Sequence, residues 1–94
     1  MFNKLKQMKD MHSQAKAIQS SLAEETVTGE AVNGLVKIDM NGNQEVQDVH
    51  IDSSLLTPEN QDQLENAIVE ATNNCFKEIK SLMMRKVQSG EISL

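Results

Sequence analysis

Three side chains that lie close together in the sequence, His50, Asp52 and Ser53, are of the types that form a nucleophilic triad. In a strand, neighbouring side chains alternate between the two faces, so His50 is expected to point away from the face that takes Ile51. Triads depend on geometry and not on adjacency, and the sequence has no Gly-x-Ser-x-Gly nucleophile elbow. We therefore predict that the protein is not an enzyme and has no catalytic residues.

Metal and cofactor chemistry rests on very few candidates. Cys75 is the single cysteine, so neither a disulfide within the chain nor a thiolate cluster is possible, and the two histidines are not clustered. We interpret Cys75 as a small buried side chain on a helix, and His12, next to Met11, as a half-exposed structural residue. The glycines form no phosphate-binding loop. We expect no metal, no cofactor and no small-molecule substrate.

The formal net charge of −5 argues against binding to nucleic acid through net charge alone. The charges are unevenly distributed, however. Residues 1–25 carry a net charge of +1, residues 26–58 carry −4, and residues 59–94 carry −2. Bases are therefore concentrated towards the two ends of the chain, and the middle segment has the most negative net charge.

A helix is predicted over residues 3–24. Its apolar side chains recur with a mean spacing close to 3.5 residues, which keeps one seam of a helix facing a neighbour. The stripe is narrow, which suits packing against one other helix. The repeating residues are Leu5, Met8, Met11, Ala15, Ile18 and Leu22.

Three strands are predicted over residues 26–32, 35–40 and 45–51, from their β-branched residues and the loss of helical period. Asn33-Gly34 predicts a two-residue type I′ turn, and Asn41-Gly42 begins a second turn. The third strand has valines on both faces unless a bulge near Gln47-Asp48 shifts its register.

A second helix is predicted over residues 58–88. Thr57 is a favourable N-cap, and Pro58 and Glu59 suit a first helical turn. Its apolar seam is broader than that of the first helix. The seam comprises Leu64, Ile68, Ala71, Cys75, Ile79 and Leu82, and is widened by Val69, Phe76 and Met83.

The predicted order is αβββα, an α+β fold with a three-stranded antiparallel meander in one domain over residues 1–94. Helices of these lengths would reach about 33 and 45 Å, so they must project beyond so small a sheet. Pairing of the helices and joining of two sheets in a symmetric homodimer would cover their apolar seams. The expected dimer and helix seam comprises Leu5, Met8, Met11, Ile18, Leu22, Ile68, Phe76, Ile79 and Met83.

Several short motifs resemble those of the YbaB/EbfC nucleoid-associated proteins. They include a Lys/Gln/Met-rich first helix, Val27-Thr28-Gly29-Glu30 followed by Gly34-Leu35-Val36-Lys37, the Asn41-Gly42 turn, and Val49-His50-Ile51-Asp52 with Ser54-Leu55-Leu56. The resemblance covers about residues 3–88. It implies a tweezer-like dimer in which the sheets form the body and the helices form two arms that hold duplex DNA. Many relatives have a longer start and a Gly/Pro/Met-rich tail, which this sequence does not show.

The resemblance also implies that the partner is duplex DNA and that the protein is located at the nucleoid. If the two helices run antiparallel, the start of the first approaches the end of the second and creates a basic tip on an acidic body. We expect mostly phosphate contacts, because the sequence has no Trp or Tyr and only two Phe for base stacking, and no recognition helix with base-reading Asn and Arg. The expected DNA-binding residues are Lys4, Lys6, Lys9, Lys16, Lys77, Lys80, Arg85 and Lys86.

The location and the absence of a membrane partner are predicted as well. The polar start and the absence of a long apolar run predict a cytoplasmic protein without a membrane partner, and the resemblance adds association with the nucleoid. The alternative function is that of a protein-binding adaptor, because methionines give a helix a soft apolar surface that accepts varied partners. Those methionines are Met8, Met11, Met83 and Met84.

Overall fold

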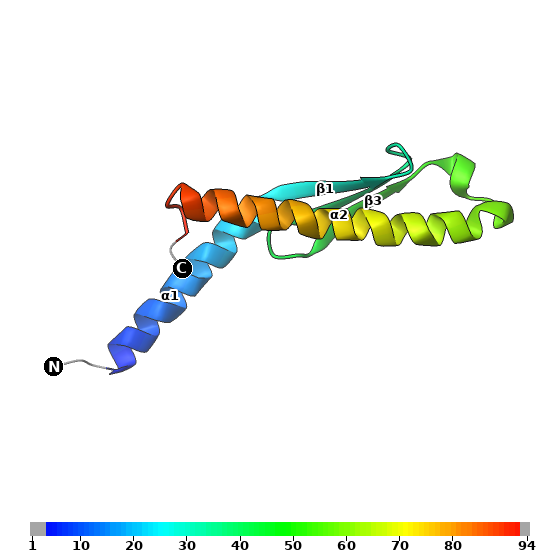
Figure 1. Ribbon diagram of the computed structural model, residues 1–94. Helices are drawn as coiled ribbons and strands as arrows, with labels where there is room; N and C mark the ends of the chain where they lie inside the picture. Colours follow the sequence, from blue (N-terminus) through cyan, green and yellow to red (C-terminus); the bar gives the residue numbers. More distant parts are fainter. Residues whose placement is uncertain (1–3, 93–94) are drawn as a thin grey trace.

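The computed structural model describes residues 4–92, with side chains from Gln7 onward, and it has the predicted αβββα order. Helix α1 spans Lys4–Ala23, and helix α2 spans Gln61–Gln88. Strands β1 (Thr26–Ala31), β2 (Val36–Asn41) and β3 (Val46–Ile51) lie between them, followed by short 3-10 turns at Ser53–Leu55 and Pro58–Asn60. The molecule is elongated, with extents of 68 × 24 × 17 Å (Figure 1).

The sheet is an antiparallel meander in the order β1-β2-β3, and α2 covers one of its faces. In β1 and β2, alternate side chains point towards α2 and are buried, as the period of a strand requires. The sheet contributes Val27, Ala31, Val36, Ile38 and Met40 to the core, and the helix contributes Ala67, Ala71, Cys75, Ile79 and Leu82.

Small residues allow α2 to lie close to the sheet. A Cβ atom on Gly29 of β1 would lie 2.0 Å from the carbonyl oxygen of Ala71 and 2.7 Å from Sγ of Cys75. The Cys75 thiol is buried, as predicted, and donates a hydrogen bond to the carbonyl of Ile38 at 3.1 Å. Desolvation raises the pKa of this thiol, so the side chain is held as an unreactive packing residue.

Of the two alternatives for β3, the bulge is the one present. Asp39 pairs with Asp48, but Met40 pairs with Val46, so Gln47 is the extra residue. The bulge restores the alternation of apolar side chains, because it turns Val46 to the same face as Val49. That face is the one covered by α2 over β1 and β2.

The connection between β1 and β2 differs from the predicted two-residue turn. Ala31 pairs with Val36, so the loop has the four residues between them. Val32, Asn33 and Gly34 all have positive φ, of 54°, 55° and 86°. This conformation is costly for a β-branched residue. Val32 packs against the core, and that contact compensates for the cost.

Helix α2 begins later than predicted, and its face towards the sheet keeps most of the expected seam. Pro58 opens a 3-10 turn rather than the α-helix, and the Thr57 side chain makes no capping hydrogen bond. The face turned to the sheet is centred on Ala67, Ala71 and Cys75, whereas Ile68 is exposed. Close approach of the backbones selects small side chains for the interface, which hydrophobicity alone does not reveal.

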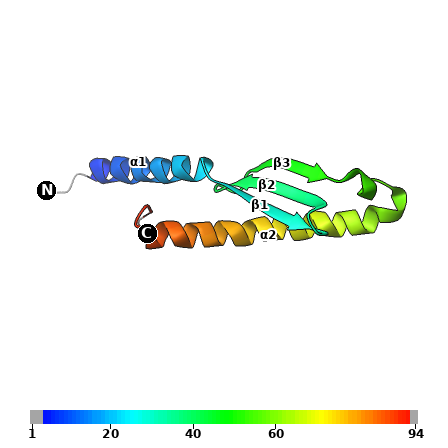
Figure 2. The same ribbon diagram turned by 90° about the horizontal axis from the view of Figure 1, so that it is seen from above.

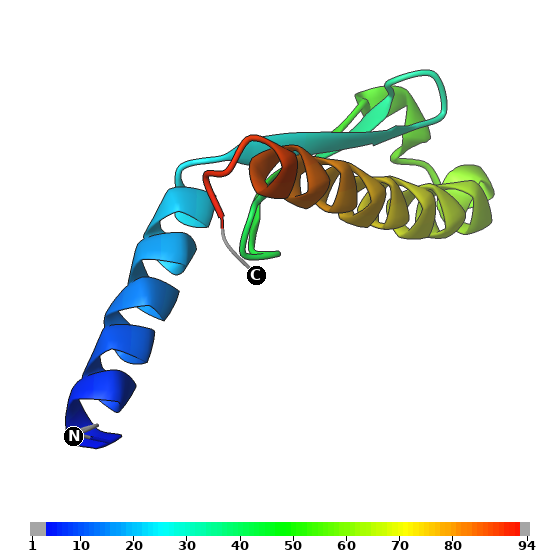
Figure 3. The same cartoon turned by 60° about the vertical axis from the view of Figure 1, so that its left-hand side comes forward.

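Helix α1 leaves the body instead of packing along α2. Every residue from Gln7 to Ala17 is exposed, and the helix diverges from α2 in two views (Figures 1 and 3). The expectation that α1 packs against another helix is therefore not met within one chain. Among the described residues, no helix is long and apolar enough to cross a membrane.

Candidate nucleic-acid interface

Helix α1 carries an excess of positive charge. Four lysines stand against one acid, Asp10, within its 20 residues. Lys9 and Lys16 are exposed, and their spacing of seven residues places them on the same side of the helix. Lys4 and Lys6 belong to α1, but their side chains lie outside the described part of the chain.

The body that carries this arm is acidic. Residues 24–60 contain eight acids and one base, Lys37. Lys9 lies 14 residues before the end of α1, or about 20 Å at 1.5 Å per residue. This separation exceeds the Debye length of about 8–10 Å at physiological salt, so the acids of the body reduce the potential around Lys9 only weakly.

Helix α2 presents further bases with a balancing number of acids. Lys77 and Lys80 are exposed and lie on the side of the helix opposite Cys75 and the sheet. Arg85 is exposed near the end of the helix. These three side chains are accessible to a phosphate.

Lys86, in contrast, is buried. Its side chain is 5% exposed, and Nζ lies 2.9 Å from carboxylate oxygens of both Glu25 and Glu91 and 3.2 Å from Oγ of Ser21. The hydrogen bond with Glu91, followed by that with Glu25, raises the pKa of Lys86. An ammonium enclosed by two carboxylates is not free to bind DNA, so the structure argues against the expected role of Lys86.

The expected basic tip is not formed within one chain. Lys86 contacts Ser21 and Glu25, so the end of α2 lies at the base of α1 and not beside its start. The physical reason is the short link through Glu24 and Glu25, which carries α1 directly into β1. The start of α1 extends away from α2 (Figure 3).

The predicted seam residues of α2 divide into two groups. Ile79 is 5% exposed and belongs to the core, and Met83 is partly buried against it. Phe76 is 39% exposed. Asn74 donates to the carbonyl of Glu30 in β1 and Cys75 to that of Ile38 in β2, so the next position around the helix, Phe76, is on the side of α2 towards β3.

A second apolar surface adjoins that flank. Helix α2 covers β1 and β2, while β3 lies beyond its edge (Figure 2). Val46 and Val49 of β3 consequently remain 54% and 46% exposed on the helix side of the sheet. On α1, Met8 and Met11 are exposed and Leu22 is buried; Ile18 is half-buried, and Leu5 lies where side chains are not described.

Comparison with known proteins identifies the family. The sequence profile of the YbaB/EbfC DNA-binding family matches residues 1–91. This chain belongs to the YbaB/EbfC DNA-binding family. The resemblance inferred from its short motifs is thereby confirmed.

Relatives of this YbaB/EbfC protein support the assignment along the whole chain. A nucleoid-associated protein of Bartonella bacilliformis is 37% identical over 89 residues, which are 95% of this chain and 82% of that protein. A nucleoid-associated protein of Moorella thermoacetica is 32% identical over 92 residues, covering 96% of this chain and 88% of that protein. The crystal structure of an uncharacterized protein from Helicobacter pylori matches with a TM-score of 0.65 and 25% identity, covering 88% and 93% of the two chains.

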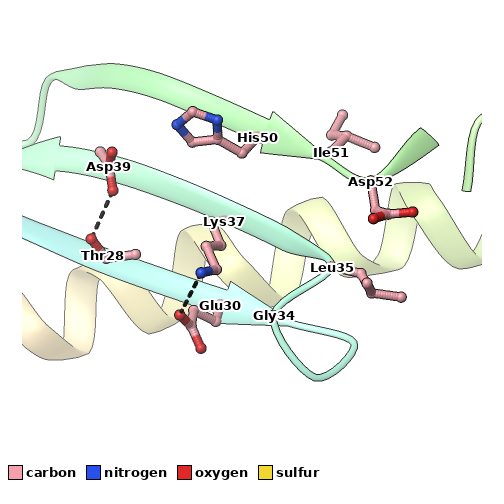
Figure 4. Close-up of a pocket in the computed structure, with 9 residues that line it drawn as sticks. All are labelled: Thr28, Glu30, Gly34, Leu35, Lys37, Asp39, His50, Ile51 and Asp52. Atoms are coloured by element: carbon pink, nitrogen blue, oxygen red, sulfur yellow. Dashed lines mark hydrogen bonds and ion pairs between the residues drawn. The ribbon is translucent and has the colours of Figure 1, made fainter. Parts of the chain in front are cut away.

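The face of the sheet opposite α2 is polar and hollowed in this YbaB/EbfC protein. An open hollow of about 670 Å³ lies over its strands (Figure 4). Lys37 pairs with Glu30 at 3.7 Å, and the Thr28 hydroxyl donates to Asp39 at 2.7 Å. The hollow is lined by Thr28, Glu30, Gly34, Leu35, Lys37, Asp39, His50, Ile51 and Asp52.

A group of side chains of the kinds that bind metal ions was not predicted from the sequence. It consists of Asp39, Asp48 and His50. Their ligand atoms lie within 4.8 Å of one another. The register of β2 and β3 joins Asp39 to Asp48, a signal that only the pairing of strands reveals. These groups already bind neighbouring protein atoms, since His50 Nε2 lies 2.9 Å from Asp48 and Asp39 accepts the Thr28 hydrogen bond.

The residues of the rejected triad serve local structure. His50 bonds to Asp48 and not to a serine. The Asp52 carboxylate accepts a hydrogen bond from the backbone N–H of Ser54 at 2.9 Å and caps the following 3-10 turn. Hydrogen bonds from Ser54 also lower the pKa of Asp52. The described residues thus show no nucleophile bonded to a general base at this position.

Proposed function

We propose that this protein is a nucleoid-associated protein that binds duplex DNA as a homodimer with little sequence preference. The observation that carries the proposal is the exposed α1 arm, which is rich in lysine and held away from an acidic body. An arm of this kind can place ammonium groups on phosphates while the carboxylates stay distant. The DNA-binding family and the nucleoid-associated names of the relatives support the same function and a location at the nucleoid in the cytoplasm.

Low sequence preference follows from what the arm offers. Specific readout uses amide and guanidinium groups on base edges, or aromatic rings on unpaired bases. The sequence has no Trp or Tyr, and the exposed bases of α1 are lysines. Lysines bind phosphates as point charges, so contacts to the DNA backbone dominate. The proposed contact set is Lys4, Lys6, Lys9, Lys16, Lys77, Lys80 and Arg85.

A homodimer fits the apolar surfaces that one chain leaves uncovered. One exposed surface is the flank of α2 at Phe76. The other is the helix side of β3 at Val46 and Val49, which lies next to that flank. If the β3 edges of two copies pair antiparallel, the sheets continue into each other and the two Phe76 flanks face across the two-fold axis. Such self-complementary contact is what a symmetric dimer requires.

Replacement of Lys9 and Lys16 by Ala tests the DNA contacts. Ala preserves the helix, so loss of binding in a mobility-shift titration would report loss of charge. The matched control replaces Gln7 and Gln14 by Ala, since these residues are also exposed and seven residues apart on α1. We expect weaker binding by the lysine variant and unchanged binding by the control. Equal affinity of the lysine variant and the wild type would contradict the proposal.

The methionines favour a second candidate function, that of a protein-binding adaptor. Met8 and Met11 are both 68% exposed on α1, and such side chains adapt to varied partners. Pull-down from nuclease-treated lysate separates the two functions. A nucleoid protein loses most of its companions when the DNA is digested, whereas an adaptor retains them.

A further inference from the structure

Two separate segments bond to the end of α1. They are the turn between β2 and β3 and the end of α2, and the segment that follows α2 bonds to Lys86 at that end. The last carbonyls of a helix have no partner within the helix, so their bonds to other segments determine how the helix end is held. The contacts are therefore informative about the direction of the arm.

The turn between β2 and β3 holds one side of α1. The Gly42 N–H donates to the carbonyl of Leu22 at 2.9 Å, and Nδ2 of Asn43 donates to the carbonyl of Gln19 at 2.9 Å. Gln19 and Leu22 are three residues apart, so the two bonds grip successive turns along one side of the helix. A Cβ atom on Gly42 would lie 2.7 Å from the Leu22 oxygen, so the contact requires glycine.

This turn is itself held in shape. The Asn41 side chain is buried, and its oxygen accepts from the N–H groups of Asn43 at 3.0 Å and Glu45 at 3.1 Å. Its Nδ2 donates to the Glu45 carboxylate at 2.9 Å. The two donors that reach α1 are therefore fixed relative to the sheet.

Lys86 holds a second side of α1. It reaches Ser21, about 100° around the helix from Leu22, and Glu25 in the link to β1. Glu91 completes its surroundings, and the Ile92 N–H donates to the Lys86 carbonyl at 3.2 Å. These hydrogen bonds lie on two sides of α1 and at different positions along its axis, so they restrict both the tilt and the rotation of the helix.

We propose that Gly42, Asn43 and Lys86 form an arm-base clamp that holds α1 at one fixed angle to the sheet, so that the arm is a rigid lever and not a flexible tether. The alternative is free hinging at the short link of Glu24 and Glu25. The fixed angle of the arm is a property of the chain itself. Its consequence for DNA, a fixed opening between two arms, rests on the proposed function.

Distance measurements between spin labels test the clamp without DNA. Labels at Ser13→Cys on α1 and Ser81→Cys on α2 occupy exposed positions, and Cys75 is buried. Labelled chain is mixed with an excess of unlabelled chain, so that distances within one chain are recorded. Asn43→Ala and Lys86→Met loosen the clamp from its two sides, and Lys80→Met, an exposed lysine of α2, is the matched control.

The clamp predicts a narrow distance distribution in the wild type and the control, and a distribution about twofold wider in each clamp variant. A broad wild-type distribution, or a double Asn43→Ala/Lys86→Met variant as narrow as the wild type, would overturn the proposal. Circular dichroism verifies folding, and Asn43→Ala decides the outcome if Lys86→Met is unfolded. A narrow wild-type distribution in a protein that does not bind DNA would overturn the proposed function and leave the clamp intact.

Discussion

Gly29 lies where α2 and the sheet approach each other closely. Its missing side chain leaves space that the Ala71 backbone and the Cys75 sulfur occupy. We expect Gly29→Ala to lower the free energy of unfolding by about 2–3 kcal/mol, because overpacking against backbone forces the helix to shift. Urea unfolding measures this change. Thr28→Ala, on the open face of the same strand, is the control and is expected to cost about 1 kcal/mol or less, which is the usual net contribution of a hydrogen bond.

Lys86 gives the protein a predictable response to alkaline pH. Its pKa is raised above the ordinary 10.5 by hydrogen bonds with Glu91 and Glu25, so the folded state favours the charged lysine. The stabilisation is fully present below pH 10.5 and is lost as the pH rises through the higher pKa of the folded state.

Thermal unfolding of the wild type and of Lys86→Met, from neutral to strongly alkaline pH, measures how much the charged lysine stabilises the fold. The difference in melting temperature between the two proteins should be constant from neutral pH to pH 10.5 and shrink above pH 10.5. A difference that stays constant to the highest pH would show that the ammonium does not stabilise the fold. Lys80→Met, whose lysine is exposed, serves as the reference.

At the scale of elements, α2 packs one face on its own sheet and leaves one flank exposed, which we propose contacts a second copy. Ile79 belongs to the packed face and Phe76 to the exposed flank. We expect Ile79→Ala to lower the free energy of unfolding by about 2–5 kcal/mol through loss of core packing. Phe76→Ala should instead weaken the dimer, with the mass from light scattering falling towards the 10.5 kDa of one chain as the protein is diluted.

The exposed Glu78, two residues beyond Phe76, supplies the control for this prediction. Glu78→Ala should leave both the stability and the mass unchanged. A Phe76→Ala protein with an unaltered mass at every concentration would place the dimer contact elsewhere.

The sequence predicted the elements well because their signals are local. Alternation and turn residues located the strands, and the mismatch of Val46 with Val49 left two alternatives, of which the bulge at Gln47 is the one present. Most of the seam of α2 was predicted, but the burial of Ala67 and the exposure of Ile68 were not, because the packed face depends on the close approach of α2 to the sheet at Gly29. The loop at Val32 was missed because core packing overrides the cost of its backbone conformation.

At the scale of the whole molecule, the direction of α1 depends on contacts between distant segments. The bond of Lys86 to Ser21 joins residues 65 positions apart, and no periodicity reports it. The distribution of charge along the sequence indicated the basic arm. It also included Lys86, whose ammonium group pairs with Glu25 and Glu91 inside the fold. Exposure of the helical bases was therefore predictable from the sequence, whereas the burial of Lys86 at a junction between segments was not.

The central claim is that a dimer binds duplex DNA through lysine contacts to phosphates. The most direct test is the affinity for two duplexes of unrelated sequence, measured by fluorescence anisotropy over a range of salt concentration. We predict similar affinities for both duplexes and a log K that falls by about 0.9 for each phosphate contact per tenfold increase in salt. Affinity that is independent of salt, or binding to one duplex alone, would contradict the account.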